Sequence, residues 1–282
     1  MRTSDARIKA MKDCKEQAAK EFATEFGVVK QIDEVYSELL DGLGPQIEKV
    51  RSELLNRNGT IQPDTNKYVK LANYGLALRN YRLLHCALDD LESGHYEVAM
   101  NLLRTVDECK NLMRYFAIDK NKNEAEKWWF NKGEKGKKVN GKKVKGDPIL
   151  SHGEVRKRLG ISGDMNEMYA DWYSHAYDFR SLIPMVLDEK TEYHGYPYFI
   201  RDECYRCLGL WIDYANKTID NLQEVFKVEQ IGDDMAWVGK VVNVQMRACQ
   251  CCNKIRSDLA KEARAHDPQL PNDINNPSSE QV

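Results

Sequence analysis

The sequence predicts an all-α protein, a multi-helix bundle of about seven to nine helices with a flexible lysine-rich insertion. Three observations lead to this prediction. Apolar residues recur every three or four positions along most of the chain, as they do on the buried face of an amphipathic helix. Runs with the two-residue period of a β-strand are scarce. Several glycines and prolines stand between the periodic segments, where helices start and stop.

We expect one helical-bundle domain over residues 1–266. Its parts are an N-terminal helical segment (1–57), the bundle core (65–226), a flexible basic loop (132–148) and a long C-terminal helix (233–264) that packs on the bundle or extends for dimerisation. The tail, 267–282, is rich in proline and asparagine and is predicted to be disordered.

Short signals delimit the helices. Residues 4–26 form a charged amphipathic segment that should stop at Gly27. The next segment, 28–57, is interrupted by "DGLGP" at 41–45, which predicts two helices or one sharp kink. Two further helices are expected at 65–92 and 95–118. Their apolar stripes are Tyr74, Ala77, Tyr81, Leu84, Leu88 and Leu91 in the first, and Leu102, Val106, Cys109, Met113 and Phe116 in the second.

The composition limits the classes of function. Apolar residues make up 42% of the chain and charged residues 30%, with a formal net charge of -2. Because there is no overall positive charge, contact with nucleic acid would need a local basic patch. No apolar run has the length of a signal peptide or a membrane span, so we expect a cytoplasmic protein with no membrane partner and with reduced cysteines.

The helix at 95–118 has a polar face opposite its apolar stripe. Arg104 and Glu108 lie on that face four residues apart and can form an ion pair. The face either is solvated or forms a polar seam against another helix that lines a cleft.

The lysine-rich loop is the candidate nucleic-acid contact. Up to Gly146 it has seven lysines and one glutamate, and Asn140-Gly141 predicts a hairpin turn. Lysines beside two tryptophans could hold a phosphate backbone while an indole stacks on a base. The alternative is a solvated insertion without a ligand. The candidate binding residues are Lys135, Lys137, Lys138, Lys142, Lys143, Lys145, Trp128 and Trp129.

A histidine further on could take part in acid–base chemistry. After a short helix with Ser151 as its N-cap and Glu154 three residues later, an apolar stripe from Met168 to Val186 has His175 at its centre. Asp171, four residues earlier, could orient the imidazole. His175 is therefore either a hydrogen-bonded core residue or a catalytic base or acid.

The cysteines of "CYRC" and "CQCC" could supply four thiolates to zinc. Cys204, Cys207, Cys249 and Cys252 also fall on or beside apolar stripes, and we favour core packing over a metal site. We therefore expect no metal and no cofactor.

Part of the chain resembles an uncharacterised bacterial all-helical family. The resemblance covers about residues 94–185, through "LLRTVDE", "GEVRKRLG" and "NEMYADWYSHAYDFRSL". That family has an "LLR...E" helix followed by a helix with an "LS...HP"-like turn, although here Ala176 takes the place of the proline. The resemblance places Arg104, Glu108 and His175 on the family's recurrent polar positions.

A second resemblance is to the HEPN-type helical ribonucleases, which cleave RNA without metal through an arginine and a histidine with four to six residues between them. "RNYRLLH" at 79–85 has that spacing. The resemblance implies that His85 acts as general base or acid while Arg79 stabilises charge on the phosphate. On one straight helix these residues lie about 240° apart, so they meet only if the helix bends or a second protomer contributes; Arg82 and His85 share a face more readily.

Two functions are therefore expected. The first is a cytoplasmic protein that binds or acts on RNA or another nucleic acid, in its finer form a metal-independent HEPN-like ribonuclease of a toxin or phage-defence system. The second is a non-catalytic helical module that binds a partner protein or forms a homodimer.

Overall fold

The computed structural model describes residues 3–55, 65–118, 121–129, 138–139, 142–143, 150–161, 197, 199–226 and 235–266. In these ranges the protein is an all-α bundle with eight helices and one very short hairpin, which confirms the predicted fold class. The helices are α1 (Thr3–Glu21), α2 (Ala23–Leu55), α3 (Thr65–Glu92), α4 (Tyr96–Ala117), α5 (Lys122–Trp129), α6 (His152–Leu159), α9 (Arg201–Phe226) and α10 (Met235–His266). The strands are β1 (Lys138–Val139) and β2 (Lys142–Lys143).

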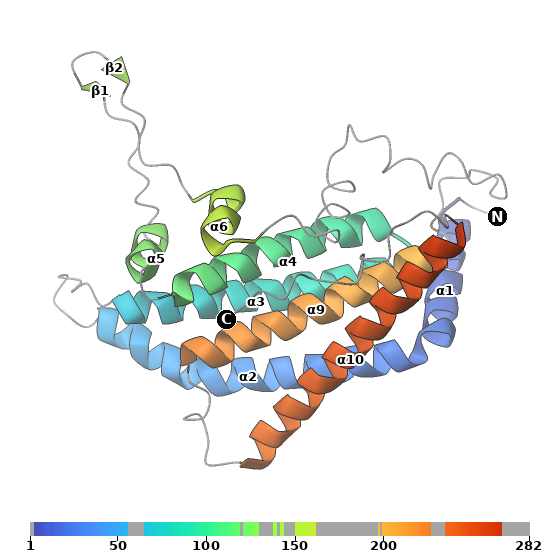
Figure 1. Ribbon diagram of the computed structural model, residues 1–282, viewed down its shortest axis with the longest axis horizontal. Coiled ribbons are helices and arrows are strands. Elements are labelled where there is room, and N and C mark those ends of the chain that lie inside the picture. The colour runs from blue at the N-terminus through green and yellow to red at the C-terminus, as the bar shows by residue number, and fades with distance from the viewer. Residues whose placement is uncertain are drawn as a thin grey trace.

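Long helices form the body of the bundle (Figure 1). The helices α2, α3, α4 and α9 run lengthwise, and α10 crosses α9 and α2 diagonally. The shorter helices are peripheral: α1 stands at one end of the bundle, α5 packs on α3 and α4, and α6 packs on α4. One continuous apolar core, from Ala18 to Ile255, joins these helices.

The helix α9 is buried around most of its circumference. The consecutive residues Leu210, Trp211 and Ile212 are all buried, although on a helix they point in three different directions. This is possible because α9 contacts α2, α3, α4 and α10. Polar groups on α9 must therefore find partners inside the protein.

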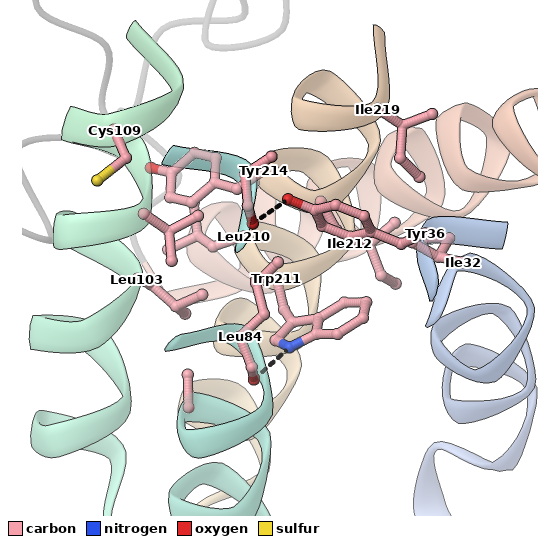
Figure 2. Close-up of a cluster of buried hydrophobic side chains, with 14 of the residues drawn as sticks. Ile32, Tyr36, Leu84, Leu103, Cys109, Leu210, Trp211, Ile212, Tyr214 and Ile219 are labelled. Carbon is pink, nitrogen blue, oxygen red and sulfur yellow. Dashed lines mark hydrogen bonds between the residues drawn. The ribbon is translucent and has the colours of Figure 1, made fainter. Parts of the chain in front are cut away.

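Hydrogen bonds across the core satisfy several of the buried polar groups of α9 and its neighbours (Figure 2). The Trp211 indole N–H donates to the Leu84 carbonyl at 2.7 Å, and the Tyr36 hydroxyl donates to the Ala77 carbonyl at 2.9 Å. The Asn80 amide donates to the Thr218 hydroxyl at 3.3 Å, and that hydroxyl donates to the Tyr214 carbonyl at 2.7 Å. Helices α2, α3 and α9 are thus held in one register by directional bonds as well as by apolar packing.

The helix boundaries agree with the sequence except near the N-terminus. Gly27 does not end a helix but lies within α2, and the break falls at Phe22. The backbone bonds Phe22 N–H to Ala18 O and Phe26 N–H to Phe22 O continue across this break, while the chain turns from α1 into α2 (Figure 1). Burial of Phe22 and Val29 on either side outweighs the weak helix preference of glycine.

The "DGLGP" segment likewise does not separate two helices, because Pro45 lies inside α2. The other boundaries lie close to those predicted. The predicted hairpin is confirmed by its paired residues, since Lys138 pairs with Lys143 and Val139 with Lys142 in antiparallel register. The predicted disordered tail, 267–282, lies outside the described residues.

Replacement of Trp211 by phenylalanine should destabilise the protein. The change leaves the Leu84 carbonyl without its donor and removes part of a tightly packed ring, so we expect the free energy of unfolding to fall by about 2 kcal/mol. Urea unfolding measures this change. Trp129→Phe is the matched control, because the Trp129 side chain is 44% exposed, and we expect a change within about 0.5 kcal/mol. Equal effects of the two substitutions would contradict the assigned role of Trp211.

Candidate functional site

A buried carboxylate on α4 is the centre of the candidate site. Asp107 is 5% exposed and accepts hydrogen bonds from Lys110 Nζ at 2.5 Å and from Asn111 Nδ2 at 2.8 Å. Lys110, 9% exposed, also lies 4.5 Å from the ring centroid of Tyr214 on α9. The Lys110 carbonyl accepts a hydrogen bond from the Asn221 side chain. The ammonium and carboxylate are therefore both compensated, as buried charges need to be.

The helix α6 supplies a histidine to this carboxylate. His152 Nε2 lies 3.9 Å from Asp107 Oδ2, and His152 Nδ1 is buried with no hydrogen-bond partner in the described part of the chain. The position of α6 is well defined by its ends. Ser151 is the N-cap and accepts a hydrogen bond from the Glu154 N–H, and Gly160 ends the helix in the left-handed conformation with φ of 69°.

Apolar packing and a hydrogen bond hold α6 against α4. Val155 is buried in the core, and Arg158 Nη1 donates a 2.6 Å hydrogen bond to the Tyr115 hydroxyl. The predicted N-cap at Ser151 is confirmed. The Glu154 carboxylate, however, accepts from Arg158 Nε at 2.8 Å, within α6 itself.

Charged groups surround the imidazole. Burial lowers the pKa of His152 below its ordinary value of 6.5, and the positive charges of Arg156 and Arg104 act in the same direction. The carboxylates of Asp107 and Glu108 oppose this shift without cancelling it. His152 is therefore a neutral imidazole at pH 7, a form able to accept a proton. We call Arg104, Asp107, Glu108, His152 and Arg156 the α4–α6 site.

Two residues of this site were predicted from the sequence. Arg104 Nε and Glu108 Oε1 are 3.4 Å apart, and both side chains are about one-third exposed. The predicted polar face of α4 therefore spans two environments: Asn111 is buried, whereas Arg104 and Glu108 lie at the surface edge of the α4–α6 site.

The structure does not bring Arg79 and His85 together within one chain. His85 Nε2 lies 2.9 Å from Asp33 Oδ1 on α2, and its ring packs edge-on against Tyr81. Arg79 instead acts on the thiol of Cys109 on α4, where it partly offsets the rise in pKa that burial causes. Arg79 therefore lies toward α4, and His85 lies toward α2.

The two candidate tryptophans differ. Trp128 packs against Phe116 in the core, with ring centroids 5.6 Å apart, whereas Trp129 is exposed. Lys138, Lys142 and Lys143 belong to the β1–β2 hairpin. His175, Lys135, Lys137 and Lys145 lie outside the described residues.

Sequence reasoning missed Asp107, Lys110 and His152. The spacing of Asp107, Lys110 and Asn111 by three and four residues indicates one helix face, and a search for polar side chains along that face could have found them. His152 gives no such signal, because its role depends on how α6 docks on α4.

Cys204, Cys207 and Cys252 behave as core residues, whereas the predicted core packing is wrong for Cys249, which faces outward on α10. Burial raises the pKa of Cys204 and of Cys252 to about 12, and that of Cys207 well above its usual range. Cys249 is exposed, so the four thiols do not share one environment. Among the described residues, no group of three or more histidine, cysteine, aspartate or glutamate side chains is placed to hold a metal ion.

Comparison with protein family models, with curated proteins and with solved structures found no match to this chain. No helix in the described ranges is long and apolar enough to cross a membrane.

Removal of the Asp107 carboxylate should strongly destabilise the protein. Asp107→Ala leaves the Lys110 ammonium and the Asn111 amide buried without their acceptor, so we expect a loss of about 3 kcal/mol in the free energy of unfolding. Glu108→Ala is the control: it removes a neighbouring carboxylate whose ion pair is partly solvated, and should cost less than about 1 kcal/mol. Similar losses in urea unfolding would argue against the buried pair.

His152 should make the stability depend on pH. Its pKa is lower in the folded protein than in the unfolded chain, so its favourable contribution is present above about pH 6.5 and is lost as the pH falls below that value. Unfolding measured at pH 7.5 and 5.5 should show a larger loss for the wild type than for His152→Gln. Titration of the imidazole by NMR gives the pKa directly, and a value above 6.5 would be inconsistent with the buried, neutral ring.

Proposed function

We propose that the chain binds RNA through the basic segment at residues 130–161, next to the α4–α6 site. The distribution of charge carries this proposal. The segment has ten lysines and arginines and three carboxylates, a net charge of +7, in a chain whose net charge is -2. The remaining residues therefore carry a net charge of -9. Concentration of positive charge in one segment is the electrostatic pattern that a polyanion recognises.

Both ends of the lysine-rich part are attached to the same side of the bundle. It begins directly after Trp129 of α5, which packs on α3 and α4. It ends at Leu150, which packs on the core directly before α6. The chain before and after the lysine-rich part is therefore anchored beside α4, the helix that carries Arg104. A bound strand could contact both the lysines and the arginines Arg104 and Arg156.

The residue types favour contact with a phosphate backbone. Lysine provides charge with little directional preference, which suits binding that does not depend on sequence. Trp129 adds an exposed indole at the start of the segment, on which a base of a single strand could stack. Trp128 is not available for this role because it packs on Phe116.

Cleavage of the bound RNA is the finer form of the proposal. A neutral imidazole close to two arginines could accept the proton of a ribose 2′-hydroxyl while an arginine stabilises the charge on the phosphate. Among the described histidines, His152 has the surroundings that favour this role. Arg104 and Arg156 are the arginines whose charges lower its pKa. His175 remains a candidate from the sequence.

A non-catalytic interaction module is the alternative function. The observation in its favour is an exposed apolar pair on α10, Val242 and Met246, whose side chains are 46% and 53% exposed. This surface belongs to a different helix from the α4–α6 site.

Binding should weaken steeply with salt. We would titrate a labelled single-stranded RNA of 20 nucleotides in chelator, between 50 and 200 mM salt, and follow its fluorescence anisotropy. Replacement of Lys137, Lys138, Lys142 and Lys143 by glutamine should reduce the slope of log K against log salt by about 3, since each lost contact with a single strand removes about 0.7. The control replaces Lys9, Lys12, Lys20 and Lys30, exposed lysines of α1 and α2, and changes the net charge equally.

The outcomes separate the proposals. No binding at 50 mM salt, or equal slopes for the two quadruple variants, would overturn RNA binding by the basic segment. Gel analysis of the same mixtures tests cleavage, with His152→Gln, His85→Gln and His175→Gln compared. Binding without cleavage would support RNA binding and would overturn the proposal that the chain is a ribonuclease.

A further inference from the structure

The outward face of α10 carries no charge. Seven positions between residues 239 and 253 are exposed and uncharged: Gly239, Val242, Asn243, Met246, Cys249, Gln250 and Asn253. Helical geometry places them together within one outward sector, opposite the buried residues Val241, Val244 and Ala248. In a chain with 30% charged residues, an exposed helical face without charge calls for a physical explanation.

The charged residues of α10 point to the sides of this face. Lys240 Nζ lies 2.6 Å from Glu38 Oε1, and Lys254 Nζ lies 2.8 Å from Glu25 Oε1, both on α2. Arg256 lies on the other side, 3.5 Å from Asp213 on α9. Arg247, which is exposed, also points to the α2 side, where its Nη1 donates a 3.2 Å hydrogen bond to Gln31 Oε1. These positive charges therefore hold α10 on the bundle, and the face between them is left neutral.

The uncharged face has the spacing of a helix–helix seam. Gly239, Val242, Met246, Cys249 and Asn253 follow one another by three, four, three and four residues, which is the seven-residue repeat of paired helices. The apolar side chains at its centre, Val242 and Met246, are about half exposed. Methionine adapts its shape readily and is frequent at such contacts.

Gly239 gives an independent indication. It lies inside α10, where alanine would favour the helix, and a Cβ atom built there would meet nothing within 4 Å in the part of the chain that the structure describes. Packing among the described residues therefore gives no reason for a glycine at this position. Close approach of a second helix does, because glycine lets two backbones come together.

We propose that α10 packs against α10 of a second copy of this chain across a two-fold axis near Met246. In a symmetric pair each surface meets its own copy, so any charge on it would meet a like charge. The outward face of α10 satisfies this condition over four turns. With the axis at Met246, Gly239 of one copy faces Asn253 of the other, and Val242 faces Gln250. The proposal does not depend on RNA binding.

The mass in solution tests this dimer. We expect sedimentation velocity of the full chain to give twice its 32.6 kDa. Met246→Arg and Gly239→Arg should both give a monomer, because each places a charge opposite its own copy. Gly239→Arg has room on the free chain, and circular dichroism of both variants checks that they remain folded. Val98→Arg is the control, since it changes an exposed apolar residue of α4 and should leave the dimer intact.

Cross-linking gives a second readout. Of the eight cysteines, Cys86 and Cys249 are exposed and the others are buried. A short bismaleimide, which joins two thiols by addition, should link two chains in the wild type and in Cys86→Ser but not in Cys249→Ser. A monomeric wild type would overturn the proposal. So would a dimer that survives Met246→Arg, or one that is linked through Cys86 instead.

Discussion

Burial of α9 on nearly all sides determines how the other long helices are arranged. Where α9 is enclosed by α2, α3, α4 and α10, its buried polar side chains cannot be left to water, and several of them reach a group on a neighbouring helix. Trp211 reaches a carbonyl of α3, and Asn221 reaches a carbonyl of α4. These bonds require the helices to have one relative position along their axes, whereas apolar contact alone would allow them to slide. The register of α3 and α4 is therefore set by α9.

That register also determines where α4 can carry charge. One side of α4 faces α3 and α9 and is apolar, and α6 covers part of the other side. At the boundary between these environments lie Asp107 and Lys110, buried but paired, with Arg104 and Glu108 one step closer to solvent. A buried pair of this kind contributes less to stability than to specificity, because its desolvation costs offset most of its attraction. The pair gives α6 one docking position on α4, in which the His152 imidazole of α6 lies beside Asp107.

Much of the fold could be predicted from the sequence, because local sequence signals indicate where its helices begin and end. The apolar periods of 65–92 and 95–118, the N-cap at Ser151 and the pairing of β1 with β2 all depend on residues close together in the chain. The predicted helix end at Gly27 was wrong because it depended on the local preference of glycine alone. Buried residues on both sides of Gly27 keep this part of α2 helical. In the candidate site, the ion pair of Arg104 and Glu108 could be predicted from the sequence, because the two residues are four positions apart on one helix. Their relation to His152 could not be predicted, because it arises from the packing of α6 on α4, which brings together residues 44 or more positions apart in sequence.

The two candidate surfaces lie on helices that α9 separates. It contacts both α4, which carries the α4–α6 site, and α10, which carries the uncharged face. A second copy seated on α10 would therefore leave the basic segment of each chain free. A symmetric pair would then present two segments of +7 each in one particle, and a single long polyanion bound at one would be held near the other. The neutral face and the basic segment are therefore complementary: the absence of charge on the outward face of α10 allows two highly charged segments to be joined without like charges meeting on that face.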